Sequence, residues 1–425
     1  DDTDFEIHGF GDVTQYDEKF KQAMDNARDD PVLGYFNFSK AMIHLYRDFF
    51  KDNVLEKLKK IKFDLILPDV VNYLSPFLKK ELNIPKQIYL NPTCILTFDF
   101  DIFEYNPAYN PIIGTKFNEK MNFFERLVNS VFLAGTKVIY KYFAITQSAV
   151  FKENGYSYEL DPFPKDSMYL NQCVNGVHYA LSLPPNIQSI GSVLPQESKP
   201  LADKELSDFL DRHEYNIYVS QGTITKIIRV DTFNELFKAF PNVGFVLSLK
   251  ESFDKDFKLA DNVLRRHWFP QNDLLGDKRI TGFITHGGLN SILESLYHAK
   301  PMITIGTNID QVNSAVIVNY RKYGIGLTSE SEITIDNLKA HVKELISNKE
   351  FKANCEIASK HVKEQNGREK FYYWLSYVLE YGYDHLMVPS YSELSFIQLY
   401  NIDIHLIWIA VLFILFKIFK RLCFK

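Results

Sequence analysis

The sequence contains little cysteine and no excess of positive charge. Four cysteines occur among 425 residues, at Cys94, Cys173, Cys355 and Cys423. No two of them have the spacing of metal ligands, and a disulfide framework requires a denser pattern. The formal net charge of −5 gives no electrostatic reason to expect a nucleic-acid partner. These absences argue against a disulfide scaffold and a nucleic-acid-binding protein, although so few cysteines say little about the cellular compartment.

A signal peptide is also missing from the beginning of the chain. The residues Asp1-Asp2-Thr3-Asp4 are acidic, whereas a signal peptide needs a basic region followed by an apolar one. We interpret the chain as a mature or truncated form, or as a protein that never had a signal.

The other end of the chain is strongly apolar. Residues 402–419 are almost all hydrophobic and are followed by a basic tail over 420–425. A membrane-spanning helix needs about 20 apolar residues. A buried core helix is the alternative, but the terminal position, the lack of a polar face and the basic stop favour a single membrane span. The tail is then expected on the cytoplasmic side, with everything before the span across the membrane. The glycosylation acceptor Asn37-Phe38-Ser39 agrees weakly with lumenal exposure.

Length and composition predict a globular protein of two or three units. The chain is 46% hydrophobic and 24% charged, and it is too long for one ordinary core. In its first half, strand 63–67, helix 71–82 and strand 86–90 form an expected strand–helix–strand unit. A long helical stretch is expected over 116–143. Prolines within 184–200 then mark a linker.

The alternation of strands and helices restarts after the linker. The expected elements are strand 217–220, helix 231–240, strand 243–248, strand 280–285, helix 291–298, strand 302–305 and helix 312–323. Two such α/β halves predict two doubly wound, Rossmann-like sheets that face a cleft. Ligands of these sheets bind at the carboxyl ends of the strands.

One strand-to-helix turn has the residues of an anion site. His286-Gly287-Gly288 follows strand 280–285 directly, and Asn290 and Ser291 begin the next helix. Glycines let a backbone approach a ligand closely, and helix amides attract negative charge. With side-chain donors from His286, Asn290 and Ser291, the turn suits a diphosphate. The alternative is structural, because Ser291 with Glu294 also fits a capping box.

The surroundings of this turn resemble a known family. Trp268-x-Pro270-Gln271 and a leucine pair lie upstream, and Pro301 and Asp310-Gln311 lie downstream. Their order and spacing resemble the UDP-glycosyltransferases, and most closely the membrane-bound UDP-glucuronosyltransferases. The resemblance covers most of the chain and implies a two-domain architecture of the GT-B type, plus a C-terminal transmembrane helix. The implied boundaries are an N-terminal acceptor-binding domain over 1–190, a linker over 191–215, a UDP-sugar-binding domain over 216–380, a juxtamembrane segment over 381–401, a span over 402–419 and a tail over 420–425.

The resemblance also implies roles for individual residues. Trp268 would stack on uracil, whose flat face needs a π-surface. Gln271 would bond the ribose or base, and Glu294 would accept bonds from the ribose hydroxyls. The turn residues His286, Gly287, Gly288, Asn290 and Ser291 would hold the phosphates. Asp310 and Gln311 would bind hydroxyls of the transferred sugar. Ser220, Gly222 and Thr223 would approach the donor, whereas Gln221 departs from the apolar residue usual there.

Catalysis in the resembled family uses a histidine base on the first N-terminal strand. Asp69 matches the aspartate that orients this base, although it also reads as a strand-end cap. The histidine itself has no evident match: His8 does not follow a strand-like run, and His44 lies on a helical stretch. Either the chain is a fragment or this form lost its base, and we favour the fragment. Transfer would invert the anomeric carbon, with no metal and no cofactor besides the UDP-sugar co-substrate.

Alternatives remain open for the reaction and its substrates. Asp99-x-Asp101 and Asp254-x-Asp256 could bind a metal in a metal-dependent glycosyltransferase. A catalytically impaired protein could instead bind UDP-sugar as a partner of full-length relatives, in a homo- or hetero-oligomer. Glucuronic acid is the expected sugar, with glucose as the second choice, and the abundant aromatics suggest a small lipophilic acceptor. The resemblance further implies the endoplasmic reticulum membrane, lumenal catalytic domains and a detoxification role.

Overall fold

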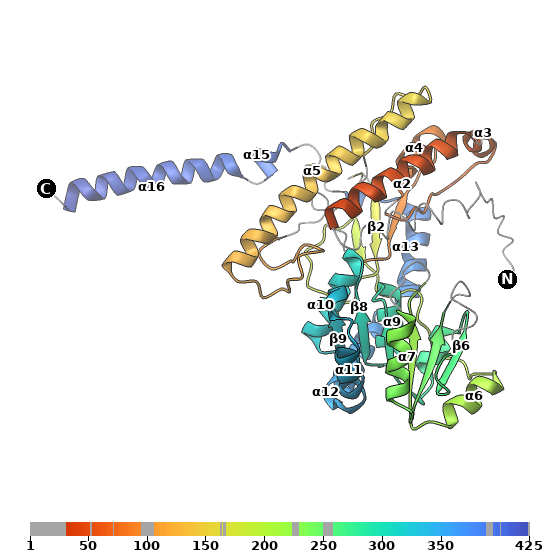
Figure 1. Ribbon diagram of the computed structural model, residues 1–425. Coiled ribbons are helices and arrows are strands. Elements are labelled where there is room, and N and C mark those ends of the chain that lie inside the picture. The colour runs from red at the N-terminus through yellow and green to blue at the C-terminus, as the bar shows by residue number, and fades with distance from the viewer. Residues whose placement is uncertain are drawn as a thin grey trace.

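The computed structural model describes residues 31–51, 53–70, 72–94, 106–161, 164, 167–222, 229–249, 258–387, 394–399 and 401–423. Thr223, His8 and both Asp-x-Asp pairs lie outside these ranges. Within them the chain forms two parallel sheets, one of three strands and one of six. The ribbon shows the two sheets in separate α/β bodies, with a long helix projecting from one side (Figure 1). This arrangement confirms the predicted fold class.

The first sheet is small and is covered by aromatic-rich helices. Its strands are β1 (Ile88–Asn91), β2 (Met168–Asn171) and β3 (Ile187–Ser189), in that spatial order. Helices α2 (Pro31–Lys51), α3 (Val54–Leu58), α4 (Ser75–Glu81) and α5 (Phe123–Glu153) belong to the same half. Buried rings, among them Tyr46, Phe77, Phe143 and Phe151, fill the core beneath these helices. The abundant aromatics of this half therefore serve packing at these positions.

Three expectations for this half differ from the structure. The expected strand 63–67 forms a single isolated bridge, from Ile66 to Gln87 just before β1, and a second bridge pairs Asp69 with Leu90 of β1. The helix expected over 71–82 begins only at Ser75, where a proline occupies the first helical turn. The long helix begins at Phe123 rather than at residue 116, because Asn122 and Glu125 form a reciprocal capping box there.

The second sheet matches the sequence-based expectation more closely. Its strands are β4 (Tyr215–Ser220), β5 (Val243–Ser248), β6 (Val263–Arg266), β7 (Ile280–Thr285), β8 (Met302–Ile305) and β9 (Gly324–Leu327). Its helices are α6 (Lys204–Asp211), α7 (Val230–Ala239), α8 (Gln271–Gly276), α9 (Leu289–Tyr297), α10 (Ile309–Arg321), α11 (Ile335–Ser347) and α12 (Lys349–Glu364). Strands β5, β7 and β8 have the predicted bounds.

The sequence pattern missed two strands of this sheet, β6 and β9. β9 contains two glycines, which weaken a strand signal. The structure explains them by close backbone approach: a Cβ on Gly326 would lie 2.0 Å from the Ala315 carbonyl oxygen, and one on Gly324 would lie 1.8 Å from the Met302 carbonyl oxygen. Glycine is required here by packing against α10 and β8, which a single-sequence pattern does not reveal.

The C-terminal part of the chain returns to the first sheet. Helix α13 (Gly367–Tyr381) and the turn η2 (Asp384–Leu386) follow α12. Val378 and Tyr383 are buried with Ile88, Met168 and Leu170 in a common cluster, and the Lys86 ammonium donates to the Leu379 carbonyl oxygen at 2.5 Å. The predicted domain span 216–380 therefore includes a helix that packs on the other domain. The predicted linker 191–215 likewise contains α6, whose Phe209 and Leu210 belong to the second core.

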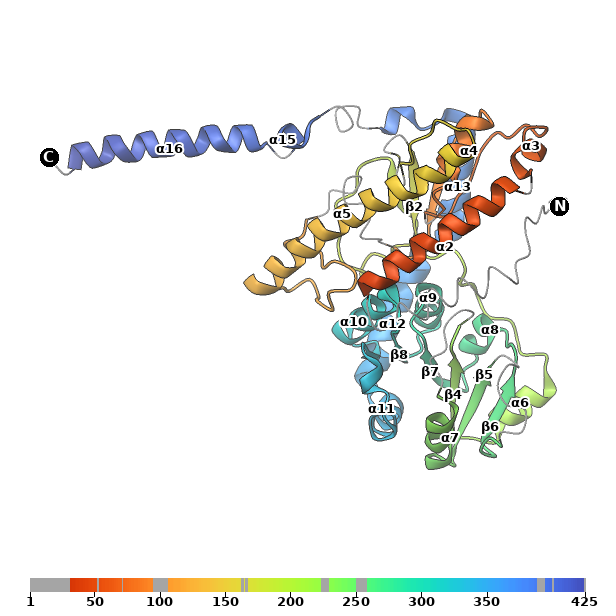
Figure 2. The same ribbon diagram turned by 45° about the horizontal axis from the view of Figure 1, so that its top comes forward.

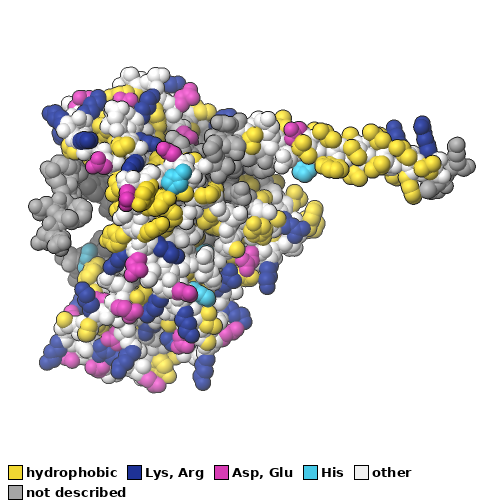
Figure 3. Space-filling model, turned by 180° about the vertical axis from the view of Figure 1, so that it is seen from behind, with side chains coloured by type: hydrophobic (Ala, Val, Ile, Leu, Met, Phe, Trp, Pro, Cys, Tyr) yellow, Lys and Arg dark blue, Asp and Glu magenta, His cyan; other side chains and the backbone are white. Residues whose placement is uncertain are grey.

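Two helices end the described chain, α15 (Phe396–Leu399) and α16 (Ile402–Cys423). Within the stretch from Ile402 to Leu422, an 18-residue window has a mean hydropathy of 2.3, and none of that window is buried. It is the only helix among the described residues that is long and apolar enough to cross a membrane. Seen from behind, it projects as an apolar rod with basic side chains near its far end (Figure 3).

A disulfide joins Cys94 to Cys173, with an S–S distance of 2.00 Å. The two cysteines follow β1 and β2, which are neighbouring parallel strands, so the disulfide links two loops at the carboxyl edge of the first sheet. Sequence spacing did not reveal this pair because 79 residues separate its members. The scarcity of cysteine argues against a framework of several bridges, and it says nothing against a single one.

Candidate functional site

The order of strands in the second sheet identifies where a ligand binds. The order β6-β5-β4-β7-β8-β9 reverses direction between β4 and β7. At such a switch point, neighbouring loops leave the sheet in opposite directions and open a crevice at the carboxyl ends of the strands. The loop after β4 contains Ser220, Gln221 and Gly222, and the loop after β7 contains His286, Gly287 and Gly288. The two predicted donor-binding loops are therefore adjacent.

A cavity of about 720 Å³ opens at this switch point. Ten of the predicted donor-site residues line it: Ser220, Gly222, Trp268, Gln271, His286, Gly288, Asn290, Ser291, Glu294 and Asp310. Pro92 and Thr93, which follow β1, contribute a wall from the first domain. The cavity thus lies in the cleft between the two α/β halves. Contacts across the cleft include a hydrogen bond from Tyr320 of α10 to Glu119 at 2.9 Å.

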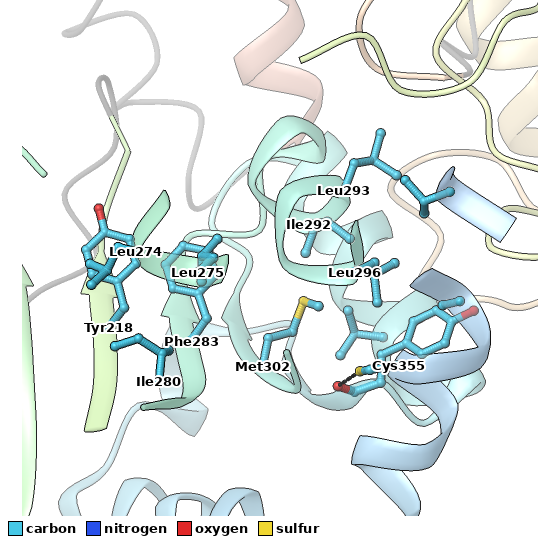
Figure 4. Close-up of a cluster of buried hydrophobic side chains, with 14 of the residues drawn as sticks. Tyr218, Leu274, Leu275, Ile280, Phe283, Ile292, Leu293, Leu296, Met302 and Cys355 are labelled. Carbon is cyan, nitrogen blue, oxygen red and sulfur yellow. Dashed lines mark hydrogen bonds between the residues drawn. The ribbon is translucent and has the colours of Figure 1, made fainter. Parts of the chain in front are cut away.

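A buried apolar cluster packs the helices that line the cavity against the second sheet. Leu274 and Leu275 of α8 and Ile292, Leu293 and Leu296 of α9 belong to one buried cluster with side chains of β4, β7 and β8 (Figure 4). Tyr218 stacks on Phe283 with ring centroids 5.0 Å apart and an interplanar angle of 5°. This packing holds α8 and α9, which provide Gln271, Asn290, Ser291 and Glu294 to the site, against the sheet.

Glycines on both sides leave the space that the His286 ring occupies. A Cβ on Gly222 would lie 2.5 Å from the ring, and one on Gly288 would lie 2.4 Å from its Nε2 atom. Gly222 also has a φ of 73°, which favours glycine. Burial lowers the pKa of His286 to about 4. The imidazole is therefore neutral at pH 7 and offers the cavity an N–H donor rather than a full charge.

The first turn of α9 faces the cavity without a side-chain cap. The helix begins at Leu289 with Gly288 in the N-cap position, and no side chain in the described part of the chain caps it. Gly288, Leu289, Asn290 and Ser291 line the cavity. Ser291 lies inside the helix rather than at its cap, so the capping-box interpretation of Ser291 and Glu294 is wrong. The backbone amides of the first turn remain available to an anion.

Gln271 and Glu294 form the second polar group of the cavity. The Gln271 amide donates to the Glu294 carboxylate and to the Ser291 hydroxyl at 3.3 Å. Burial raises the pKa of Glu294, and the bond from Gln271 acts against that rise. Trp268 lies at the rim with 69% of its surface exposed, which leaves its ring free for stacking. These positions are compatible with a nucleoside beside α8 and α9.

The structure separates Asp310 from Gln311. Asp310 lines the cavity, and burial raises the pKa of its carboxyl group. Gln311 is buried and its side-chain oxygen accepts bonds from the amides of Thr307 and Asn308 at 3.3 and 3.2 Å, which caps α10. Gln311 is not among the residues that line the cavity, and neither is Gly287, whose amide faces Thr285. Their assigned contacts with the ligand stay predictions.

The base-orienting residue lies apart from this cavity. Asp69 is exposed, pairs in a bridge with Leu90 of the first sheet and does not line the cavity. Of the candidate bases, His44 is exposed on α2.

His178 was not considered in the sequence, yet it is buried in a small second cavity that Asp310 also lines. Nδ1 of His178 lies 2.9 Å from the Val174 amide, which donates to it, and 3.3 Å from the Val174 carbonyl oxygen. Nε2 then keeps the proton, and His178 is not arranged to accept one from an acceptor hydroxyl.

Gln221 is a buried polar residue of the cavity to which the sequence analysis assigned no role. Its side chain is 5% exposed, lines the cavity, and has an amide oxygen without a hydrogen-bond partner in the described structure. A buried acceptor without a partner is unfavourable unless a ligand or water supplies a donor. The available signal was the departure of Gln221 from the apolar residue usual at this position in the resembled family.

Comparison with known proteins finds a matching family model and related sequences. The family model described as UDP-glucoronosyl and UDP-glucosyl transferase matches residues 11–425. UDP-glucuronosyltransferase 3A1 of Bos taurus is 29% identical over 87% of this chain and 71% of its own length. UDP-glycosyltransferase UGT4 of Dactylopius coccus is 28% identical over 89% and 79%, and UDP-glucuronosyltransferase 2B15 of Homo sapiens is 26% identical over 92% and 77%.

Solved structures share the fold at low sequence identity. The kitacinnamycin glycosyltransferase has a TM-score of 0.54 at 19% identity and covers 82% of each chain. The spinosyn forosaminyltransferase SpnP has a TM-score of 0.55 at 14% identity, over 80% of this chain and 83% of its own. Os79 of O. sativa, solved in complex with UDP, has a TM-score of 0.53 at 12% identity, over 84% and 86%.

Proposed function

The chain belongs to the family of UDP-glucuronosyl and UDP-glucosyl transferases, and on this premise we propose that it transfers glucuronic acid from UDP-glucuronic acid to a hydroxyl of a small lipophilic acceptor. UDP-glucose is the second candidate donor. The observation that carries the proposal is the uncapped first turn of α9, which faces the switch-point cavity beside the glycine-enclosed His286.

The cavity can accommodate each part of such a donor. The uracil would stack on Trp268, and the ribose hydroxyls would donate to Glu294, whose carboxylate would exchange its bond from Gln271 for them or share it. The diphosphate would accept bonds from the α9 amides, Asn290 and His286. Asp310, which lines the cavity, would accept a hydrogen bond from a hydroxyl of the sugar. One solved structural neighbour contains UDP, which agrees with this donor class.

Transfer requires stabilisation of the leaving UDP and removal of a proton from the acceptor. The first-turn amides of α9 and the N–H of His286 would stabilise the charge that develops on the diphosphate. With these donors in place we propose inversion at the anomeric carbon without a metal. A base oriented by Asp69 would remove the acceptor proton. If no base is present, the protein would bind UDP-sugar without transfer and act as a partner of relatives.

The proposed location is the membrane of the endoplasmic reticulum, with both α/β domains lumenal. Helix α16 supplies a candidate anchor, and its basic end suits the cytoplasmic face. The Cys94–Cys173 disulfide supports the same side, because disulfides persist in oxidising compartments and are rare in the cytosol.

Calorimetry and a product assay on the same preparation test the proposal. The preparation is titrated with UDP and incubated with UDP-glucuronic acid or UDP-glucose and a phenol, with and without a chelator. Binding with chelator-resistant glucuronide formation is expected. Binding without any product would favour the binding partner, and loss of turnover on chelation would show a metal requirement. Failure to bind UDP would refute the donor site.

A further inference from the structure

The outward face of helix α5 is apolar along most of its length. Phe124, Leu127, Val131, Val138, Tyr142 and Ile145 are exposed by 73, 52, 63, 70, 50 and 64%. Their spacing of three, four or seven residues places them on one side of the helix. We call these six residues the α5 stripe. No charged residue occurs between Leu127 and Thr136, so this part of the first half of the helix has no ionic group that would favour contact with water.

The inward face of the same helix is partly polar. Asn129 is fully buried; its amide nitrogen donates to the Pro107 and Asn110 carbonyl oxygens at 2.9 Å, and its oxygen accepts from the Ile112 amide at 2.7 Å. Thr136 and Gln147 are also buried. A helix on a protein surface normally turns its polar face outward. Tyr140 and Phe143 are buried on the inward face as well, so α5 is apolar on its outward face in addition to its packed one.

The candidate membrane anchor lies on the same side of the molecule. Val378 and Tyr383 precede the anchor in the sequence and pack on the first sheet. The segment that leads to α16 therefore starts at the domain that contains α5. The segment from Met387 to Ile402 can span at most roughly 50 Å when extended. In both ribbon views the first half of α5 and the helices α15 and α16 project from one side of the first domain (Figures 1 and 2). A bilayer that holds α16 is thus within reach of α5.

We propose that the α5 stripe lies in the interfacial layer of the bilayer that α16 crosses. An interfacial helix inserts its apolar face by about 5–10 Å and lies in the membrane plane. The stripe is roughly 32 Å long at the rise of an α-helix, and Lys141, which is exposed beside it, suits anionic headgroups. The first domain therefore contacts lipid directly and is held in one orientation by two elements, α5 and α16.

A fluorescent label on the full-length chain tests this contact. Val131→Cys is made in a background with Cys355→Ser and Cys423→Ser, labelled with an environment-sensitive dye, and reconstituted in vesicles of phosphatidylcholine and phosphatidylserine. Nitroxide-labelled lipid and aqueous iodide are then compared as quenchers. Ile357→Cys, on α12 of the other domain and 55% exposed, is the matched control. We expect several-fold stronger quenching by lipid than by iodide at Val131, and the reverse at Ile357.

Two results would overturn the proposal. Iodide quenching at Val131 equal to that at Ile357 would show a stripe exposed to water. Protection of Val131 from both quenchers would show a protein partner, such as a second copy of the chain, in place of lipid.

A second variant separates docking from folding. Phe124→Ser, Val131→Ser and Val138→Ser together remove three of the six apolar side chains of the stripe without touching the core, since all three are mostly exposed. With a label at Ile145→Cys, we expect lipid quenching to fall to the level of the Ile357 control while UDP binding is unchanged. Persistent lipid quenching at Ile145 in this variant would show that the stripe does not hold α5 on the membrane.

Discussion

The two α/β halves of this molecule differ in how well the sequence predicted their elements and in the size of their sheets. The second half has six strands, and its ligand loops leave the sheet at a topological switch point. The first half has three strands of three or four residues, connected by long segments and packed with aromatic rings. The cavity of the second half therefore depends on backbone geometry, in which amides and glycines take part, whereas the first half depends on side-chain packing and on one disulfide.

The largest expected effect concerns the disulfide of the first half. Removing Cys94–Cys173 should lower the free energy of unfolding by about 4 kcal/mol, because the bridge closes a loop of 79 residues in the unfolded chain. We expect Cys94→Ser to raise the acceptor KM while the Kd for UDP stays the same, as measured by kinetics and calorimetry. Cys355→Ser, at a buried unpaired cysteine, is the control. Equal weakening of UDP and acceptor binding would remove the distinction between the halves.

A substitution in the cavity of the second half should weaken UDP binding and leave the stability of the fold nearly unchanged. Glu294→Ala removes the carboxylate assigned to the ribose hydroxyls, and hydrogen bonds to a charged group contribute about 1.5–3 kcal/mol each. We expect UDP to bind roughly 100-fold more weakly, with the melting temperature nearly unchanged. Asp69→Ala is the matched carboxylate on the acceptor side and should reduce turnover without affecting UDP binding. An unchanged Kd in Glu294→Ala would refute the assigned ribose contact.

Acid should destabilise both halves through buried histidines. Burial lowers the pKa of His178 to about 4, and that of His286 to about 4, against about 6.5 in an unfolded chain. Between these values the unfolded state binds more protons, so the free energy of unfolding falls as pH falls from about 6.5 to 4. His178 alone should account for about 3 kcal/mol at most. Denaturant titrations of His178→Asn should show a shallower pH dependence, and an unaltered slope would contradict a buried neutral His178.

The smallest expected effect is at Gln221. If its unpartnered amide bonds a sugar hydroxyl, Gln221→Met should weaken UDP-sugar binding by about 1 kcal/mol, roughly fivefold, and leave UDP binding unchanged. Calorimetry with both ligands gives this ratio. Parallel weakening of both ligands would instead assign Gln221 to the nucleotide portion. Methionine is chosen because its volume is similar and it leaves no buried polar atom.

Much of the second half could be predicted because its signals are local. Three strands have the predicted bounds, and ten predicted donor residues line one cavity. The Gln311 side-chain oxygen caps α10 through the nearby amides of Thr307 and Asn308, and its assigned contact with the sugar stays a prediction. One of the missed strands has a tertiary cause. β9 was missed because its glycines are explained only by contacts with β8 and α10. In the first half, strand 63–67 was expected from its apolar run, but it forms only one isolated bridge, from Ile66 to Gln87.

The sequence alone determined the class of the fold, the apolar C-terminal helix and the turn from His286 to Ser291, since periodicity, hydrophobic runs and glycine positions are properties of adjacent residues. Tertiary structure decided the rest. It showed that α9 begins without a capping box, that the His286 ring is enclosed by glycines from two loops, that Cys94 pairs with Cys173, and that α5 exposes its apolar face. Burial, disulfide pairing and exposure depend on contacts between segments that are distant in the sequence, and such contacts exist only in the folded chain.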